Sequence, residues 1–213
     1  VGDAEMDEGN MYEALLEGRK HDLRNCWWII DYNRQSLDAV VSDRMFRWID
    51  RTFRNTGWTV VTLKYGKRMM EAFKRPGGKV LKKWINACPN DLYSALTFQG
   101  GAHWRQQLWN DIGDEDGIED LLRSYDDDAL QDLMTNLAGH DLDAVRQAFH
   151  AAADAESPVC FIAYTIKGHG LPFEGHKDNH AGLMNQAQIE ADVEVEGPCF
   201  IDADCLVRTG ARL

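Results

Sequence analysis

The chain has 213 residues, of which 44% are hydrophobic, and a formal net charge of −12 at neutral pH. This length and hydrophobic content suit one domain, or a large piece of one, while the acidic charge argues against nucleic acid as a partner. No apolar run approaches the ~20 residues of a membrane span, no signal peptide is visible, and five cysteines without close pairing indicate reduced thiols and a cytoplasmic protein rather than disulfides.

The first 38 residues contain a Gly-Asp turn, a helix and an apolar strand. The helix is predicted from about Met6 to His21. The run Cys26–Ile30 has the length and content of a strand buried on both faces of a parallel sheet. Strands of a βαβ unit end at the same edge of the sheet, so Asp3 should meet Asn33 and Gln35 there, although 30 positions separate Asp3 from Asn33.

This edge of an α/β protein is where phosphates bind. A carboxylate, an amide oxygen and a main-chain carbonyl are hard oxygen ligands, suited to Mg²⁺ bound together with a diphosphate. For the turn alone, a polar turn beside a solvated strand end is the better explanation. An EF-hand is excluded, because its sixth and twelfth loop positions would be Glu8 and Ala14 instead of Gly and Glu.

Val1 directly precedes the Gly-Asp turn, so the strand that should feed this turn is missing. We therefore expect the chain to be a fragment that is truncated at its N-terminus.

The middle of the chain alternates predicted helices with one strand. A loop is expected over Ser36–Val41. The pair Gly100-Gly101 could let the backbone approach a ligand, but without a strand and a helix around it this is weak evidence for a binding site. The lysines of one predicted helix resemble a phosphate patch, but a solvated helix face explains them better. The predicted strand is Trp58–Leu63. Helices are predicted over Asp43–Asn55, from after Gly66 to about Lys74, over Lys79–Ala87 and over Ala102–Ile112, and the segment Leu92–Phe98 precedes the last of them. The lysines in question are Lys79, Lys82 and Lys83.

Residues Asp114–Ala155 are acidic and predicted to be helical, with breaks near Asp126 and at Gly139–Asp141. They suggest peripheral scaffolding. Asp141 fits the N-cap of a helix over Leu142–Ala153. The two histidines of this segment, His140 and His150, are expected to be packed or solvated rather than catalytic.

The last clear strand is Pro158–Tyr164, and a glycine-rich segment with three histidines follows it. Zinc is one interpretation, but no cysteine or carboxylate completes a tetrahedral set at a familiar spacing. A mobile active-site loop is the other, with glycines as hinges and a histidine as proton carrier.

Two separate motifs carry a resemblance to a known family. Residues 2–9 read GDAEMDEG and residues 33–38 read NRQSLD, and together they resemble the thiamin-diphosphate motif of the transketolase superfamily. The pattern is most similar to the homodimeric pyruvate dehydrogenase E1 component, which has a GDGEMDE turn followed by an N-x-Q-x-L-D run. Residues 165–170, TIKGHG, resemble the T-I-K-G-x-G segment of the same family. The resemblance extends from Gly2 to about Gln188.

The resemblance implies two cofactors, Mg²⁺ and thiamin diphosphate. It implies that Mg²⁺ is bound by the Asp3 carboxylate, the Asn33 side chain and the Gln35 main-chain carbonyl. The cofactor would also be contacted by the residues around these ligands. The implied cofactor-binding residues are Gly2, Asp3, Ala4, Glu5, Asn33, Gln35 and Lys167.

One departure from the motif is Ala4, which replaces its second glycine. Alanine is tolerable there if φ is negative and unfavourable if φ is positive. His180 corresponds to the loop histidine of the family and is the implied catalytic residue, assisting proton or acyl transfer near the cofactor.

The fold class that we expect is α/β, a three-layer parallel sheet flanked by helices, as in the thiamin-diphosphate-binding fold, without its first strand. Residues 1–190 would be a partial diphosphate-binding domain with a helical insertion at about 100–155, and residues 191–213 a tail of uncertain structure. The resemblance implies oxidative decarboxylation of pyruvate with acetyl transfer to a lipoyl group.

The implied parent protein is a homodimer, in which the pyrimidine-binding domain supplies a glutamate that this chain lacks. The lipoyl domain of an E2 component is a further implied partner. Two alternatives stay open: a transketolase that transfers a two-carbon ketol unit between sugar phosphates, and a non-catalytic remnant or isolated binding module. The chain alone is expected to be inactive.

Overall fold

The computed structural model describes residues 1–36, 39–40, 45–176, 179 and 185. Three parallel strands form its sheet in the order β1-β5-β4: β1 (Trp27–Tyr32), β5 (Val159–Tyr164) and β4 (Thr59–Leu63). The central strand β5 is buried along its whole length, as an apolar strand between two neighbours should be. Gly2 forms a parallel bridge with Asp31 on the other edge of β1. The predicted α/β class with a parallel sheet is confirmed.

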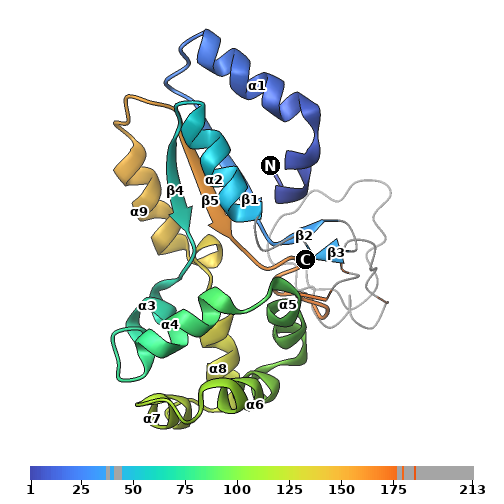
Figure 1. Ribbon diagram of the computed structural model, residues 1–213, viewed down its shortest axis with the longest axis vertical. Helices are drawn as coiled ribbons and strands as arrows, with labels where there is room; N and C mark the ends of the chain where they lie inside the picture. Colours follow the sequence, from blue (N-terminus) through green and yellow to red (C-terminus); the bar gives the residue numbers. More distant parts are fainter. Residues whose placement is uncertain (37–38, 41–44, 177–178, 180–184, 186–213) are drawn as a thin grey trace, which may run out of the picture.

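Helices cover both faces of the sheet (Figure 1). Helix α2 (Met45–Asn55) packs Ile49 and Phe53 into the larger core cluster on one face. Helix α9 (Leu142–Ala152) lies on the other face, where Phe149 packs with Phe161 of β5. The sheet thus forms the middle layer of three.

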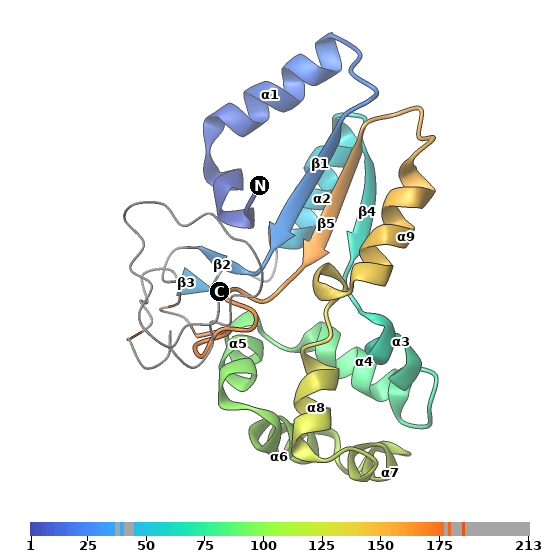
Figure 2. The same cartoon turned by 180° about the vertical axis from the view of Figure 1, so that it is seen from behind.

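The prediction that the first strand is buried on both faces is wrong. Side chains of β1 alternate in burial, and Trp27 and Ile29 are 41% and 44% exposed. The reason is the sheet order: α9 lies beside β4 and covers the β1 end of this face only in part, through the contact of Phe149 with Trp27 (Figure 2). Contiguous apolar residues do not reveal which strand is central.

The N-terminal helix is also shorter than predicted. A 3₁₀ helix, η1 (Asp3–Asp7), comes first, and α1 (Gly9–Lys20) starts only after Glu8, whose backbone is extended. The expected loop after β1 contains a short antiparallel pair, β2 (Gln35–Ser36) with β3 (Ala39–Val40). The break at Glu8 lets Asp3 turn toward the sheet edge separately from α1.

Six helices between β4 and α9 gather beyond the carboxyl edge of the sheet (Figure 1). Asp126 caps α8 by accepting from the Ala129 N–H at 2.8 Å, and Asp141 caps α9 as predicted, accepting from the Ala144 N–H at 3.1 Å. These helices are α3 (Lys67–Ala72), α4 (Gly78–Ala87), α5 (Asn90–Gln99), α6 (Gly101–Ile112), α7 (Ile118–Arg123) and α8 (Asp127–Met134), and a 3₁₀ turn, η2 (Ala138–His140), precedes α9.

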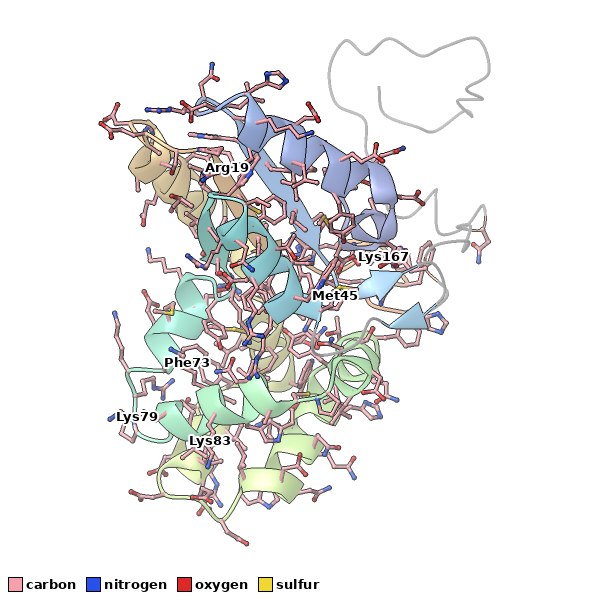
Figure 3. All side chains as sticks on the ribbon, turned by 45° about the horizontal axis from the view of Figure 1, so that its top comes forward. Arg19, Met45, Phe73, Lys79, Lys83 and Lys167 are labelled. Atoms are coloured by element: carbon pink, nitrogen blue, oxygen red, sulfur yellow. The ribbon has the colours of Figure 1, made fainter. Side chains whose placement is uncertain are left out.

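Two different causes explain the Gly100-Gly101 pair: Gly100 has a positive φ of 92°, and Gly101 lies in a close backbone contact. A Cβ atom on Gly101 would lie 1.7 Å from the carbonyl oxygen of Asp127, so α6 and α8 approach each other as only glycine permits. Lys79 and Lys83 project from α4 into solvent, far from Lys167 (Figure 3), in agreement with a solvated helix face.

Two observations concern the class of protein. Within the described ranges, no helix is both long and apolar enough to cross a membrane. The three described cysteines, Cys26, Cys88 and Cys160, are free thiols. The proposed tail 191–213 lies outside the described residues.

Candidate functional site

Asp3 meets the loop after β1 at the carboxyl edge of the sheet. Val1 and Gly2 run parallel to β1, with the Asp31 N–H donating to the Val1 carbonyl at 2.7 Å. The chain then turns into η1, and the Asp3 side chain is only 1% exposed. Its Oδ2 atom accepts a hydrogen bond from the Arg34 N–H at 2.7 Å. The structure thus brings Asp3 to the segment between Asn33 and Gln35, as the sequence predicts.

Asn33 and Gln35 shape the loop through hydrogen bonds of their own. The Asn33 Oδ1 atom accepts from the Gln35 N–H at 3.0 Å, which closes a tight turn. Arg34 lies between them at φ 69°, a left-handed conformation that costs a non-glycine residue about 1–2 kcal/mol. Such strain is found where the surroundings hold a loop in place, often at functional sites.

The Gln35 side chain connects this loop to distant parts of the chain. It is 5% exposed, and its Nε2 atom donates to Ser94 Oγ at 2.8 Å and to the Gly175 carbonyl at 3.1 Å. Ser94 itself donates to the same carbonyl at 2.5 Å. A helix and the loop after β5 therefore fix the backbone of Gln35, whose carbonyl is the implied metal ligand.

The electrostatics of Asp3 suit a cation. The pKa of this carboxyl is raised to about 6, chiefly by burial and also by the nearby Asp31, while the hydrogen bond from the Arg34 N–H opposes the shift. The Asp3 Oδ1 atom is buried without a hydrogen-bond partner in the described part of the chain, and so is Gln35 Oε1. A buried carboxylate oxygen without a donor is a position that a hard cation would satisfy.

The donor set also fits such an ion. Among the described residues, no three His, Cys, Asp or Glu side chains gather as a metal cluster. A cation at Asp3 would therefore need the amide and main-chain oxygens of Asn33 and Gln35, which is the oxygen-rich set that Mg²⁺ prefers.

The turn at residues 2–5 accommodates the change from glycine to alanine. Ala4 is not among the residues with positive φ, so its methyl group creates no backbone strain. Gly2 has an extended backbone with open space beside its Cα atom. The Gly2 N–H donates to the Glu5 carboxylate at 3.2 Å, so Glu5 caps η1.

Lys167 approaches the site from the loop after β5. It lines a small cavity of about 10 Å³, room for one water, together with Asn33, Arg34 and Gln35. Its carbonyl accepts from the Gly175 N–H at 3.0 Å and from Asn179 Nδ2 at 2.8 Å, which folds the loop back on itself. His180 lies outside the described residues, so its catalytic role stays a prediction.

His140 is packed, as expected. Its ring stacks on His169 at 3.9 Å between centroids, and its Nε2 atom accepts from the Ile166 N–H at 2.8 Å. Burial, followed by the neighbouring His169, lowers the pKa of His140 to about 4. The imidazole is therefore neutral at physiological pH and supports the start of the loop.

Sequence reasoning missed three residues of this edge. Arg34 occupies a variable position of the N-x-Q-x-L-D run, so the motif assigns it no role, yet its guanidinium lies 4.1 Å from the centre of the Tyr93 ring. Ser94 carries no local signal, because its partners are distant in sequence. Lys64 directly follows β4 at the same edge, and this position at a strand end was the available signal.

Taken together, the described residues form an α/β protein whose polar side chains gather at the carboxyl edge of a parallel sheet. No family model matches the chain. It is similar to pyruvate dehydrogenase E1 components from several bacteria. The identity is 26% for the Cupriavidus necator protein, covering 90% of this chain and 21% of that protein. The identity is 27% for the Mycobacterium tuberculosis protein, covering 84% of this chain and 19% of that protein. It is 26% for the Escherichia coli K12 protein, covering 80% of this chain and 19% of that protein.

The chain thus spans about a fifth of the length of the curated relatives that it matches. The similarity covers most of this chain and supports a resemblance to that kind of enzyme.

Proposed function

We propose that the chain is the Mg²⁺- and diphosphate-binding part of a thiamin-diphosphate-dependent 2-oxo acid dehydrogenase of the pyruvate dehydrogenase E1 kind. The observation that carries the proposal is the meeting of Asp3 with the turn from Asn33 to Gln35, where a buried carboxylate oxygen has no donor. The similarity to pyruvate dehydrogenase E1 components supports the same assignment.

Each residue has a distinct task in this proposal. Asp3 supplies the one negative charge of the metal site, and Asn33 supplies a neutral oxygen. Gln35 contributes its main-chain carbonyl, held in position by the hydrogen bonds of its side chain to Ser94 and Gly175. The metal would neutralise the diphosphate, since the net charge of the chain, −12, repels an anion.

The bound thiamin diphosphate supplies the carbanion chemistry of 2-oxo acid decarboxylation. The chain would anchor and orient this group, and His180 would hold or deliver a proton near it. Lys167, at the start of the same loop, lines the small cavity beside Asn33 and Gln35. A homodimer, a pyrimidine-binding domain and a lipoyl domain are the partners that complete this proposal.

Metal binding can be tested with Mn²⁺, which replaces Mg²⁺ and is detected by electron paramagnetic resonance. We expect the chain to take up one Mn²⁺ that Mg²⁺ displaces, and the variants Asp3→Ala and Asn33→Ala to lose it. Asp7→Ala is the matched control, because Asp7 lies exposed in the same 3₁₀ helix. Equal uptake by Asp3→Ala and by the unchanged chain would exclude the site.

The cofactor step is tested by tryptophan fluorescence. Addition of thiamin diphosphate should change the emission only when Mg²⁺ is present, and the Asp3→Ala variant should not respond. A response of the same size without any divalent cation would contradict the proposed anchoring through the metal.

A further inference from the structure

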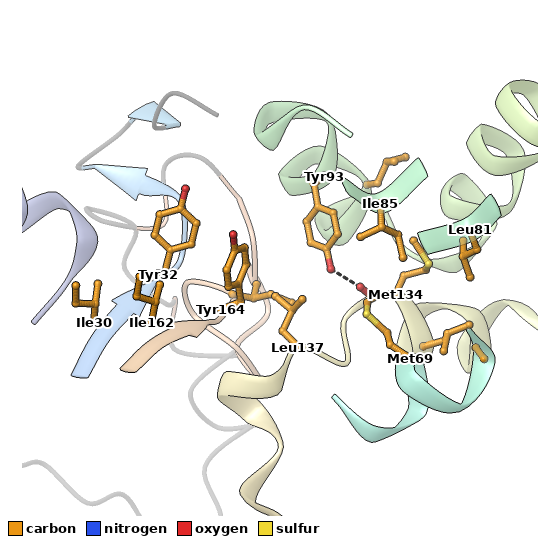
Figure 4. Close-up of a cluster of buried hydrophobic side chains, with 14 of the residues drawn as sticks. Ile30, Tyr32, Met69, Leu81, Ile85, Tyr93, Met134, Leu137, Ile162 and Tyr164 are labelled. Atoms are coloured by element: carbon orange, nitrogen blue, oxygen red, sulfur yellow. Dashed lines mark hydrogen bonds between the residues drawn. The ribbon is translucent and has the colours of Figure 1, made fainter. Parts of the chain in front are cut away.

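A cavity of about 750 Å³ lies between the carboxyl edge of the sheet and the helices beyond it. Tyr32 and Tyr164 line it from the sheet side, and Tyr93 and Ile85 line it from the helical side (Figure 4). Its size is that of a pocket for a small organic ligand. We propose that this cavity binds an organic anion, with Lys64 and Arg34 holding a carboxylate or phosphate head group and the tyrosine rings holding its body.

The described charged residues of the cavity wall are all cations. Lys64, Arg34 and Arg47 line the cavity, and no aspartate or glutamate does so among the residues that the structure describes. Among the described residues, none of these three cations forms a salt bridge. Such a concentration of positive charge is unusual in a chain with a net charge of −12, and it selects an anionic ligand.

Lys64 is held at the cavity wall from both sides. Its ammonium group donates to Asn86 Oδ1 of α4 at 2.5 Å, and it lies 5.2 Å from the ring centres of Tyr65 and Tyr164. Burial, followed by the nearby Arg34 and Lys82, lowers the pKa of Lys64 to about 8. The protonated amine is thus poorly compensated, and an anion would relieve both the burial and the repulsion between cations.

The second cation is fixed in place as well. The Arg34 guanidinium stacks over Tyr93, and its backbone N–H is held by Asp3. A planar guanidinium binds carboxylate and phosphate oxygens in pairs, so its fixed position favours these two head groups.

Aromatic rings supply the rest of the wall. Tyr32 and Tyr164 contact each other edge to face, with 4.8 Å between ring centres, and Phe46 packs against Tyr164. This surface suits a flat or apolar body attached to the anionic head group. A small inorganic ion alone would leave most of the cavity unfilled.

The cavity is separate from the proposed metal site. None of Asp3, Asn33 and Gln35 lines it, although Arg34, Asn90 and Tyr93 lie in the wall between the two cavities and border both. The proposal therefore requires neither Mg²⁺ nor thiamin diphosphate, and it can fail or succeed independently of the proposed function.

The test uses the complete 213-residue chain without divalent cations. Phenyl phosphate and benzoate carry the same ring with different head groups, and their binding is measured by isothermal titration calorimetry. We expect at least one of them to bind saturably, and Lys64→Met to weaken that binding about tenfold or more, because a charge-assisted hydrogen bond is lost. The tighter ligand identifies the head group as phosphate or carboxylate.

Lys83→Met is the matched control, since Lys83 is an exposed lysine that does not line the cavity. Circular dichroism establishes that both variants fold. Saturable binding that Lys83→Met retains and Lys64→Met loses supports the proposal. It is overturned if neither ligand binds saturably or if both variants bind alike.

A second measurement covers the case in which Lys64→Met does not fold. Lysines of the unchanged chain are acetylated with acetic anhydride, with and without the bound ligand, and quantified by mass spectrometry. The ligand should slow acetylation of Lys64 severalfold and leave Lys83 unaffected. Equal rates at Lys64 with and without ligand would overturn the proposal.

Discussion

Replacing Asp3 by asparagine should stabilise the chain when no divalent cation is present and remove any stabilisation that a cation gives. Asp3 is buried, and one of its oxygen atoms has no hydrogen-bond partner in the described residues. Asparagine has nearly the same shape, and its Oδ1 atom can still accept from the Arg34 N–H, but it carries no charge. The substitution therefore separates the structural role of Asp3 from its proposed metal-binding role.

The magnitude follows from the pKa of Asp3, which burial raises from 3.8 to about 6. A shift of this size corresponds to about 3 kcal/mol of unfavourable free energy for the ionised group at neutral pH. A neutral amide makes a hydrogen bond to the Arg34 N–H that is weaker by about 1 kcal/mol. The amide NH₂ would replace the carboxylate oxygen that has no hydrogen-bond partner among the described residues, at a cost of about 1 kcal/mol, so the expected net gain in the free energy of unfolding is about 1 kcal/mol without metal.

The pH dependence has a definite sign. Because the folded chain holds the Asp3 proton more tightly than the unfolded chain does, this contribution to stability is fully present below pH 3.8 and is lost as the pH rises through about 6. Asp3→Asn lacks this loss, so the gain from the substitution should grow over the same interval.

Urea denaturation followed by tryptophan fluorescence measures these quantities, in EDTA and in Mg²⁺. Mg²⁺ should raise the midpoint of the unchanged chain and leave that of Asp3→Asn where it was. Asp7→Asn, which removes an exposed charge from the same 3₁₀ helix, should behave like the unchanged chain. The reasoning is refuted if Asp3→Asn is the less stable protein in EDTA, or if Mg²⁺ stabilises both proteins equally.

Three further predictions concern the supports of the site. Because the pKa of His140 is lowered from 6.5 to about 4, the unfolded chain takes up the imidazole proton at a higher pH than the folded chain does. The free energy of unfolding should therefore fall as the pH drops from 6.5 toward about 4, and the urea midpoint of His140→Gln should fall less over this interval. Ser94→Ala removes a hydroxyl that bonds the Gly175 carbonyl, so hydrogen exchange of the Gly175 amide should quicken severalfold; an unchanged rate would contradict the link. Gly101→Ala should cost about 1–3 kcal/mol or more of unfolding free energy because its Cβ would strike α8, whereas Gly9→Ala, with open space, should not destabilise the chain in the same denaturation assay.

Local signals were sufficient for much of the fold. Helical periodicity and the β-rich content of short runs predicted α2, α4, α6, β4 and β5 close to their observed bounds. Asp141 was recognisable as an N-cap because the capping interaction spans only three residues. In such elements the interactions that form the element are local, so they lie within the same few residues as the sequence pattern that predicts it.

Properties that depend on neighbours were not predictable. The run from Cys26 to Ile30 looks buried, but Trp27 and Ile29 are exposed because β5, from the far end of the chain, takes the central position. The close contact of Gly101 with Asp127 likewise joins two helices that local reasoning treats separately. Burial of a strand face depends on which element covers it, and the composition of that strand does not contain this information.

The candidate site divides in the same way. Asp3, Asn33 and Gln35 could be found because a motif fixes their spacing and a βαβ unit brings strand ends together. The prediction did not include Arg34, which joins the two features of this edge. Its backbone, held left-handed at φ 69°, donates to Asp3, while its guanidinium extends to Tyr93 and borders the large cavity.

The two roles of Arg34 impose different requirements on the residue. The hydrogen bond to Asp3 needs only a main-chain N–H in a left-handed conformation, which glycine would provide at lower cost. The stacking on Tyr93 and the positive charge at the cavity need the long cationic side chain. A non-glycine residue at this position is explained if the free energy gained from its side-chain interactions exceeds the cost of the left-handed backbone conformation. The conformation of Arg34 therefore supports a role for its guanidinium in the cavity, independently of the metal site that its backbone helps to build.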